Sequence, residues 1–191
     1  MRDEQFVRNL CQQEQISLKV IDFDTAGYAK QQGISIEMAA RELRYKAFEE
    51  YRIECSADAI AVAHHRDDSA ETMLLNLIRG TGIRGLHGIR PRNEHIVRPL
   101  LCVGRADIAM FLQKENVAYV TDSTNLLTDY TRNKVRLELI PMMQQINPSI
   151  LQTLADSAER IASAEEIYLK AINKAIERVK ERSEEPELQS L

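Results

Sequence analysis

The most concentrated polar chemistry in the sequence lies between His64 and Thr72, which read His-His-Arg-Asp-Asp-Ser-Ala-Glu-Thr. Asp68 and Glu71 are three residues apart, so a helix would place both carboxylates on one face. Two such carboxylates can share a hydrated Mg²⁺ or hold an ammonium group. The same spacing also fits a helix capping box, which would only satisfy backbone donors at a helix start. The adjacent histidines favour a functional site, and the capping interpretation stays open.

A second polar cluster runs from Asp122 to Arg136. The sequence Asp-Ser-Thr-Asn over 122–125 predicts a polar turn that could order a ribose or a lysine substrate. The residues after it predict a helix on which Arg132 and Arg136 lie one turn apart. Like charges at this spacing repel slightly, and a bound anion would turn the repulsion into binding. The alternative is an ordinary turn and a surface helix that ends near Pro141.

The glycine-rich segment from Gly80 to Gly85 reads Gly-Thr-Gly-Ile-Arg-Gly. Its glycine spacing matches a dinucleotide-binding fingerprint, but that fingerprint works only between a strand and a helix. Here a helix is expected before it, so an NAD site is rejected. We predict a flexible loop whose small residues allow close backbone approach, flanked by Arg79 and Arg84. A plain loop is the alternative.

Strand and helix patterns alternate along the first three quarters of the chain. Such alternation predicts an α/β fold with a parallel sheet and ligands at the carboxyl ends of the strands. The helix that Ser35 caps would carry Arg41 and Arg44 on adjoining turns. A loop is expected between Gly27 and Gly33. The expected helices span 3–15, 35–48, 68–78 and 104–115, and the expected strands span 18–23, 59–63, 96–97 and 118–120.

A long helix is expected after the break at Asn147-Pro148-Ser149, running to about Arg182. Its apolar residues form a narrow seam near heptad spacing, which Glu165 interrupts. A helix of this length exceeds what a compact domain usually needs, so part of the seam should meet a partner. A homodimer through this helix is one such arrangement.

Composition bounds the protein class. The 191 residues are 44 % apolar and 28 % charged, enough for one generous domain or two small ones, and no apolar stretch is long enough for a membrane span. We expect a cytoplasmic protein. The three cysteines are far apart and predict neither a disulfide framework nor a zinc site.

Charge is unevenly distributed. The net charge of −4 argues against a nucleic-acid partner, but eight arginines and two lysines lie between Arg79 and Arg136 against five carboxylates. Arginine forks suit phosphate and base edges.

Five motifs in order give the chain a specific resemblance. They are Glu37–Tyr45, the His64–Thr72 segment, Arg79-Gly80-Thr81-Gly82, Arg98-Pro99-Leu100, and Asp122–Arg136. Together they resemble the bacterial tRNA(Ile)-lysidine synthetases, a family of the PP-loop ATP pyrophosphatase superfamily. The resemblance covers nearly the whole chain up to the long helix.

The resemblance implies a PP-loop ATPase domain, similar to adenine nucleotide alpha hydrolases, over 1–147, a linking helix over 148–182, and a tail or linker over 183–191. Members of the family carry a Ser-Gly-Gly-x-Asp-Ser phosphate loop after their first strand, and this sequence contains none. We therefore expect an N-terminally truncated domain that is inactive alone. Ser69 stands where glutamine is usual in the family.

The implied reaction uses ATP and Mg²⁺ to adenylate the C2 oxygen of the wobble cytidine of an isoleucine tRNA, after which free lysine displaces AMP. The implied catalytic residues are Asp68, Glu71 and His65, with Asp68 and Glu71 as candidate Mg²⁺ ligands. Contacts to nucleotide or tRNA are implied for a basic and polar set comprising Arg41, Arg44, Arg79, Arg84, Arg132, Asn133 and Arg136.

Two other functions stay open. One is another PP-loop tRNA-modifying ligase or thiolase, although thiolases of this kind commonly use paired cysteines and none are paired here. The other is a non-catalytic helical interaction module, in which the long seam binds a protein and the polar clusters are caps and turns.

Overall fold

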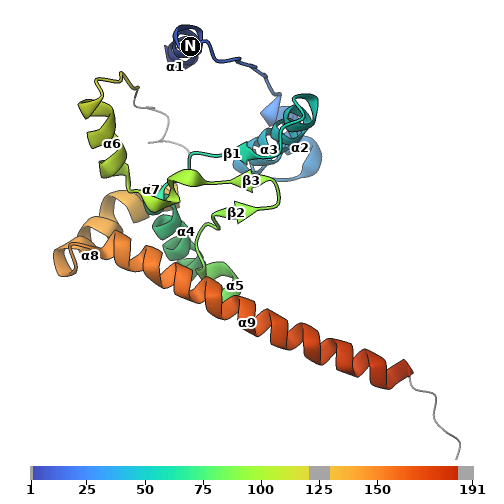
Figure 1. Cartoon of the computed structure of the whole chain (residues 1–191). Helices are drawn as coiled ribbons and strands as arrows, with labels where there is room; N and C mark the ends of the chain where they lie inside the picture. The colour runs from blue at the N-terminus through green and yellow to red at the C-terminus, as the bar shows by residue number, and fades with distance from the viewer. Residues whose placement is uncertain (1, 121–129, 185–191) are drawn as a thin grey trace, which may run out of the picture. The chain divides into compact units, whose positions relative to one another are not determined.

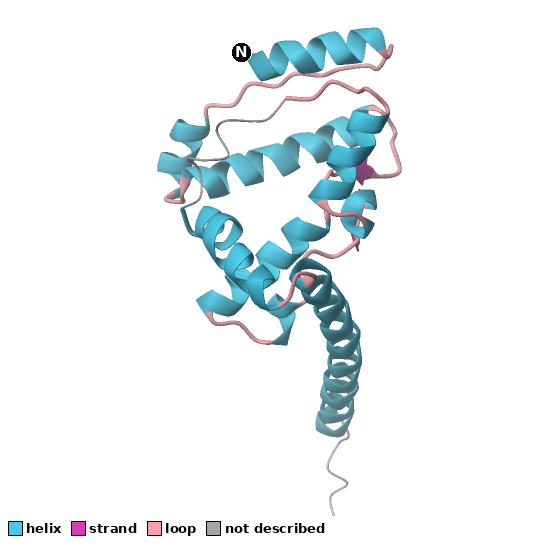
Figure 2. Ribbon diagram, turned by 90° about the vertical axis from the view of Figure 1, so that its left-hand side faces the viewer, coloured by secondary structure: helices cyan, strands magenta, loops and turns pink. Residues whose placement is uncertain are grey.

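The computed structural model describes residues 2–120 and 130–184, and the chain divides into two compact units. Unit 1 comprises Met1–His65 and Pro91–Asn133, and unit 2 comprises Arg66–Arg90 and Lys134–Leu191. Each unit is therefore built from two separate stretches of the chain. Figure 2 shows that helices dominate and that strands are few.

The elements of unit 1 are five helical segments and three short strands in its described part. They are α1 (Arg2–Gln13), α2 (Thr25–Gln32), α3 (Ile36–Glu54), β1 (Ile60–Ala61), β2 (Arg92–Asn93), β3 (Ile96–Val97), the 3-10 helix η1 (Pro99–Cys102) and α6 (Arg105–Lys114) (Figure 1). The next helix, α7 (Tyr130–Lys134), carries the chain from unit 1 into unit 2.

Helix α3 forms as the sequence predicts. The Ser35 hydroxyl accepts a hydrogen bond from the Met38 amide at 3.2 Å and so caps the first turn. Ala39 and Ala47 are buried, and α2 packs against α3. The loop expected between Gly27 and Gly33 is wrong. Asp24 caps α2 by accepting from the Gly27 amide, and Gly33 ends it at φ +66°, a left-handed conformation typical of helix C-termini.

The sheet is small and mixed, with strand order β1-β3-β2. Strands β1 and β3 run parallel, with Ile60 opposite Ile96. Strand β2 runs antiparallel to β3, with Asn93 opposite Ile96. The α/β class and the expected strand at Ile96–Val97 are confirmed, whereas the expected strand over 59–63 is only two residues long.

The expected strands over 18–23 and 118–120 are wrong. An apolar segment becomes a strand only where a neighbour exchanges backbone hydrogen bonds with it, and the described residues supply no such neighbour for either. Their apolar side chains stay exposed, 40 % for Phe23 and 59 % for Tyr119. Side-chain contacts attach the first segment to α3, because Lys19 pairs with Glu54 and its ammonium lies over the Tyr51 ring.

Unit 2 is helical in its described residues. Besides the end of α7, its elements are α4 (Arg66–Arg79), α5 (Ile83–Leu86), the π-helical segment η3 (Val135–Leu139), α8 (Ile140–Ile146) and α9 (Ile150–Glu184). The core is formed by Leu74 and Leu75 of α4 with Val135 and Ile140, and partly buried side chains of α8 and α9 pack against it. Helix α4 also packs along α9.

Pro141 does not end the helix before it, contrary to the alternative drawn from the sequence. Helical backbone continues through it to Ile146. Because proline has no N–H, it cannot donate to the Leu137 carbonyl. The backbone widens just before it, where the Ile140 amide donates to the Val135 carbonyl five residues earlier. This wide turn carries Arg136.

Helix α4 begins at Arg66, two residues earlier than the sequence pattern indicates. Asp68 is therefore its third residue and cannot be the N-cap that a capping box requires. The capping interpretation of Asp68 and Glu71 is wrong.

The long helix is confirmed as α9, with 35 residues from Ile150. Its N-terminal half contributes the buried Ala158 and Glu165 to unit 2. Further along, Ile167 and Val179 are 71 % and 67 % exposed. In the described part of the chain, no helix combines the length and apolarity that crossing a bilayer requires.

Candidate functional site

The structure brings together two carboxylates of α4 and one arginine of η3 in unit 2. Arg136 donates to Glu71 through two nitrogens, Nε to Oε1 at 2.6 Å and Nη2 to Oε2 at 2.8 Å. Asp68 Oδ1 lies 3.6 Å from Arg136 Nη2. The Glu71 side chain is 3 % exposed and that of Arg136 is 25 % exposed. The acidic pair and an arginine beyond residue 130 therefore meet in unit 2.

This pairing fixes the charge of Arg136. The hydrogen bonds that Arg136 donates to Glu71 raise the pKa of the guanidinium above its usual value, and attraction to Glu71 and Asp68 adds to the effect against the opposing cost of burial. The raised pKa favours the charged form of the arginine. Both Glu71 oxygens are used in holding it.

A Mg²⁺ ion needs several oxygen ligands whose negative charge is not already neutralised. Both Glu71 oxygens accept hydrogen bonds from Arg136, so at most Asp68 of this pair could hold an ion. Among the described residues, no three His, Cys, Asp or Glu side chains gather closely enough to hold a metal. These two carboxylates therefore do not fit a Mg²⁺ site.

Unit 1 places His64 and Arg98 at the carboxyl ends of two parallel strands. Arg98 directly follows β3 and His64 lies three residues beyond β1. Arg98 is only 9 % exposed, and its Nε donates to His64 Nδ1 at 3.2 Å. Because Nδ1 accepts, the neutral imidazole carries its proton on Nε2. His65, the predicted catalytic histidine, is the next residue and is half-buried.

Sequence reasoning assigned no role to His64 or Arg98. The signal was available, because both follow short β-rich runs and the carboxyl ends of neighbouring parallel strands meet at one edge. What the sequence did not reveal is that strands 36 positions apart in the chain are paired, Ile60 with Ile96.

Two predicted basic residues of unit 1 lie on α3. Arg41 and Arg44 are both exposed. The Arg41 Cζ lies 4.9 Å from the centroid of the Tyr45 ring, a cation–π contact. Such a contact leaves the N–H groups of an exposed guanidinium accessible to a ligand.

Arg132 and Asn133 lie on α7, and both are half-buried. Arg136 stands on the wide turn that follows and is engaged by Glu71. The polar turn expected over 122–125 lies outside the described residues.

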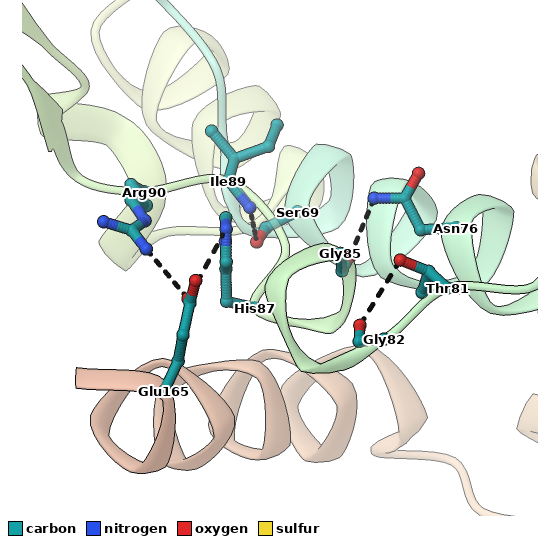
Figure 3. Close-up of polar contacts among 9 residues, drawn as sticks. All are labelled: Ser69, Asn76, Thr81, Gly82, Gly85, His87, Ile89, Arg90 and Glu165. Carbon is teal, nitrogen blue, oxygen red and sulfur yellow. Dashed lines mark hydrogen bonds and ion pairs between the residues drawn. The ribbon is translucent and has the colours of Figure 1, made fainter. Parts of the chain in front are cut away.

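The glycine-rich segment of unit 2 is not a loop along its whole length, because α5 begins within it at Ile83. Asn76 of α4 donates to the Gly85 carbonyl at 2.7 Å, and the Thr81 hydroxyl donates to the Gly82 carbonyl at 3.3 Å (Figure 3). Arg79 and Arg84 flank this segment and are exposed.

Ser69 has a structural contact at the position where the family resemblance leads one to expect glutamine. Its hydroxyl is buried and accepts from the Ile89 amide at 2.9 Å (Figure 3). Gly88 has φ +64°, and a Cβ there would lie 2.4 Å from the same hydroxyl. The small side chain at 69 therefore fits the close approach of the Gly88 backbone.

The cysteines Cys11, Cys55 and Cys102 are free thiols in unit 1, and Cys55 and Cys102 are exposed.

The chain matches the model of a known protein family over most of its length. The model of the PP-loop domain matches residues 1–143.

Two curated relatives that carry the same name illustrate the similarity. The chain is 57 % identical over 178 residues to the tRNA(Ile)-lysidine synthase of Bacteroides thetaiotaomicron, which covers 93 % of this chain and 42 % of the relative. It is 35 % identical over 182 residues to the tRNA(Ile)-lysidine synthase of Thermotoga maritima, covering 95 % of this chain and 43 % of the relative. The chain thus spans less than half the length of these relatives.

Among solved structures, the chain is similar to the U34-tRNA thiolase NcsA from Methanococcus maripaludis with its [4Fe-4S] cluster. The TM-score is 0.67 at 17 % identity, and the match covers 83 % of this chain and 55 % of that chain. At this identity the likeness shows a shared fold.

Proposed function

Because the chain belongs to the PP-loop domain family, we propose that it serves the ATP-dependent ligation of lysine to C2 of the wobble cytidine of an isoleucine tRNA, which forms lysidine. The observation that carries this proposal is the identity of 57 % to a tRNA(Ile)-lysidine synthase over 93 % of the chain. Since tRNA, ATP and free lysine are its substrates, we propose a cytoplasmic location.

The chemistry has two steps. The C2 oxygen of cytidine attacks the α-phosphorus of ATP and pyrophosphate leaves. The amine of lysine then attacks C2, AMP leaves with the former C2 oxygen, and the amine gives up a proton. The second step needs a group that orients a lysine ammonium and favours its loss of a proton, and a carboxylate can do both.

We assign that carboxylate to Asp68, and we propose a separate substrate-binding role for His65. Glu71 acts through Arg136: its buried carboxylate holds the guanidinium charged and oriented. A fixed guanidinium suits the charge that develops on a phosphate or on the adenylated oxygen. Any Mg²⁺ is expected to arrive with ATP, since the Asp68 and Glu71 pair does not fit the ion.

The exposed arginines are proposed to contact nucleotide or tRNA. Arg41 and Arg44 of unit 1 and Arg79 and Arg84 of unit 2 are all exposed, and Arg132 and Asn133 complete the proposed set. Arginine suits RNA because its planar fork binds phosphate with two hydrogen bonds.

The decisive assay measures lysine-dependent AMP release on unmodified tRNA(Ile). It uses the chain alone and a fusion that places the family's phosphate loop and following strand ahead of Met1. We expect release only from the fusion, and Asp68→Asn should lower kcat/KM by about a hundredfold or more.

The matched control is Asp67→Asn, the preceding carboxylate on α4. Undiminished turnover in Asp68→Asn would remove Asp68 from the mechanism, and AMP release that needs a sulfur donor in place of lysine would indicate a thiolase.

We also propose that a second copy of the chain packs along the exposed end of α9. Ile172, Ala175, Ile176 and Val179 line an apolar stripe there. Sedimentation should show a dimer for the wild type and a monomer for Val179→Glu, whereas the adjacent control Arg178→Glu should stay dimeric. A monomeric wild type would contradict this pairing.

A further inference from the structure

We propose that Glu165 is a positioning residue for the glycine-rich segment, in that its buried carboxylate fixes residues 85–90 on α9 and thereby presents Arg84 to an RNA phosphate. The RNA part of this inference rests on the proposed function. The anchoring part concerns unit 2 alone.

Glu165 is a buried charge in an otherwise apolar seam. It is 2 % exposed. Its Oε2 accepts from Arg90 Nη2 at 2.8 Å and lies 3.8 Å from His87 Nε2, a contact that becomes an ion pair only when the imidazole is protonated (Figure 3). A buried carboxylate is costly unless it is paired, so its partners must stay in place for the unit to remain folded. Both partners belong to the chain that follows α5.

The same stretch is held from its other side by α4. Ser69 accepts from the Ile89 amide, which lies between the two partners of Glu165 in the sequence. Gly88 approaches Ser69 so closely that a Cβ would not fit. Asn76 bonds the Gly85 carbonyl at the end of α5. Residues 85–90 are therefore clamped between α4 and α9.

Helix α5 cannot owe its shape to its own sequence. It has four residues, and its N-cap residue, Gly82, supplies no side-chain hydrogen bond. A single helical turn is unstable in water by itself, so tertiary anchors must hold it. The anchors lie at and after its C-terminal end.

The residues just before the anchored stretch stay exposed, and their types suit phosphate binding. Gly80, Thr81, Gly82 and Arg84 are exposed, and Arg79 ends α4 just before them. Small residues let a ligand backbone approach, and an arginine carried on a fixed backbone loses less conformational freedom when it binds phosphate. The single carboxylate that interrupts the seam of α9 thus acts on an arginine that it does not touch.

The first measurement is amide hydrogen exchange in Glu165→Gln, with Glu166→Gln as the matched control because Glu166 is exposed on the same helix. We expect exchange of the amides of residues 84–90 to quicken by about tenfold or more in Glu165→Gln and to stay unchanged in the control. Unchanged exchange in Glu165→Gln would overturn the anchoring.

The second measurement is a double-mutant cycle on the affinity for the anticodon stem-loop RNA, made at a temperature where every variant is folded. Glu165→Gln alone should weaken RNA binding by about fivefold or more. In the Arg84→Ala background it should weaken binding hardly at all, because the contact between Arg84 and the phosphate is already lost. Independent, multiplying effects would overturn the presentation of Arg84. A wild type that binds no RNA would refute the proposed function and the presentation together, and hydrogen exchange would still decide the anchoring.

Discussion

The two units contain the same ion-pair geometry in opposite surroundings. In unit 2, Arg136 grips Glu71 with two hydrogen bonds of 2.6 and 2.8 Å, and the carboxylate is 3 % exposed. In unit 1, Arg52 grips Glu49 with two hydrogen bonds of 2.9 and 2.7 Å, and the carboxylate is 43 % exposed.

The difference shows that burial, and not the geometry of two hydrogen bonds, decides how strongly an ion pair holds a structure together. Solvent screens the Glu49 pair, and its members are neighbours on one helix, so it orders little that α3 does not already order. The Glu71 pair joins segments 65 residues apart and leaves an uncompensated buried charge if it is broken. Only the second can make a guanidinium a fixed part of a site.

The largest expected effect comes from breaking the buried fork. Arg136→Met should lower the free energy of unfolding of the chain by about 3 kcal/mol, because Glu71 would remain buried without its partner. Urea unfolding measures the loss. The control is the double variant Glu71→Met, Arg136→Met, which removes both charges and should return to within about 1 kcal/mol of the wild type. A single variant as stable as the wild type would mean that water reaches Glu71.

A steric test in the same unit should cost less. Gly88→Ala places a Cβ 2.4 Å from the Ser69 hydroxyl at a left-handed φ of +64°. We expect a loss of about 2 kcal/mol in the free energy of unfolding, from backbone strain and overpacking together. Gly33→Ala, also at positive φ but with open space around it, separates the two causes. Equal losses would assign the whole effect to the backbone.

The hydrogen bond at the N-cap of α3 in unit 1 gives a reference value for the smaller effect expected of the exposed Arg52–Glu49 pair. Ser35→Ala removes the cap of α3 and should lower the free energy of unfolding by about 1 kcal/mol. Ser35→Asn, which can cap equally well, should restore it. A loss larger than that of Arg136→Met would reverse the ranking of the two units.

The smallest effect is expected from Glu49→Gln, which should leave the thermal midpoint unchanged within error. The hydrogen bond from Arg52 lowers the pKa of Glu49. Any stability that the pair adds is therefore present above the usual carboxyl pKa and disappears as the pH falls through the lowered value. The thermal midpoints of the variant and the wild type should agree at every pH across that acidic range. A difference at higher pH that disappears on acidification would show that the exposed pair stabilises the protein.

Local rules predicted the parts of this fold that local interactions determine. Ser35 and the apolar spacing after it gave α3, and the break at Asn147 and Pro148 gave the start of α9. The strand expected over 18–23 failed because its apolar pattern is necessary for a strand but a pairing neighbour is needed as well, and the pattern carries no information about that neighbour.

The candidate site divides in the same way. Asp68 and Glu71 were identified from their residue types and spacing. The hydrogen bonds that Arg136 donates to Glu71 depend on packing between residues 65 positions apart. No local sequence pattern reveals such a contact. Glu165 was visible as an interruption of the seam, and a lone carboxylate among apolar residues is itself a signal of a buried ion pair.

The distribution of sulfur in the chain offers a practical consequence. Cys11, Cys55 and Cys102 all belong to unit 1, and unit 2 contains no cysteine. A dye attached through maleimide would thus report the melting of one unit only, while circular dichroism would follow both. Unequal transitions seen by the two methods would show directly that the halves lose their structure at different temperatures.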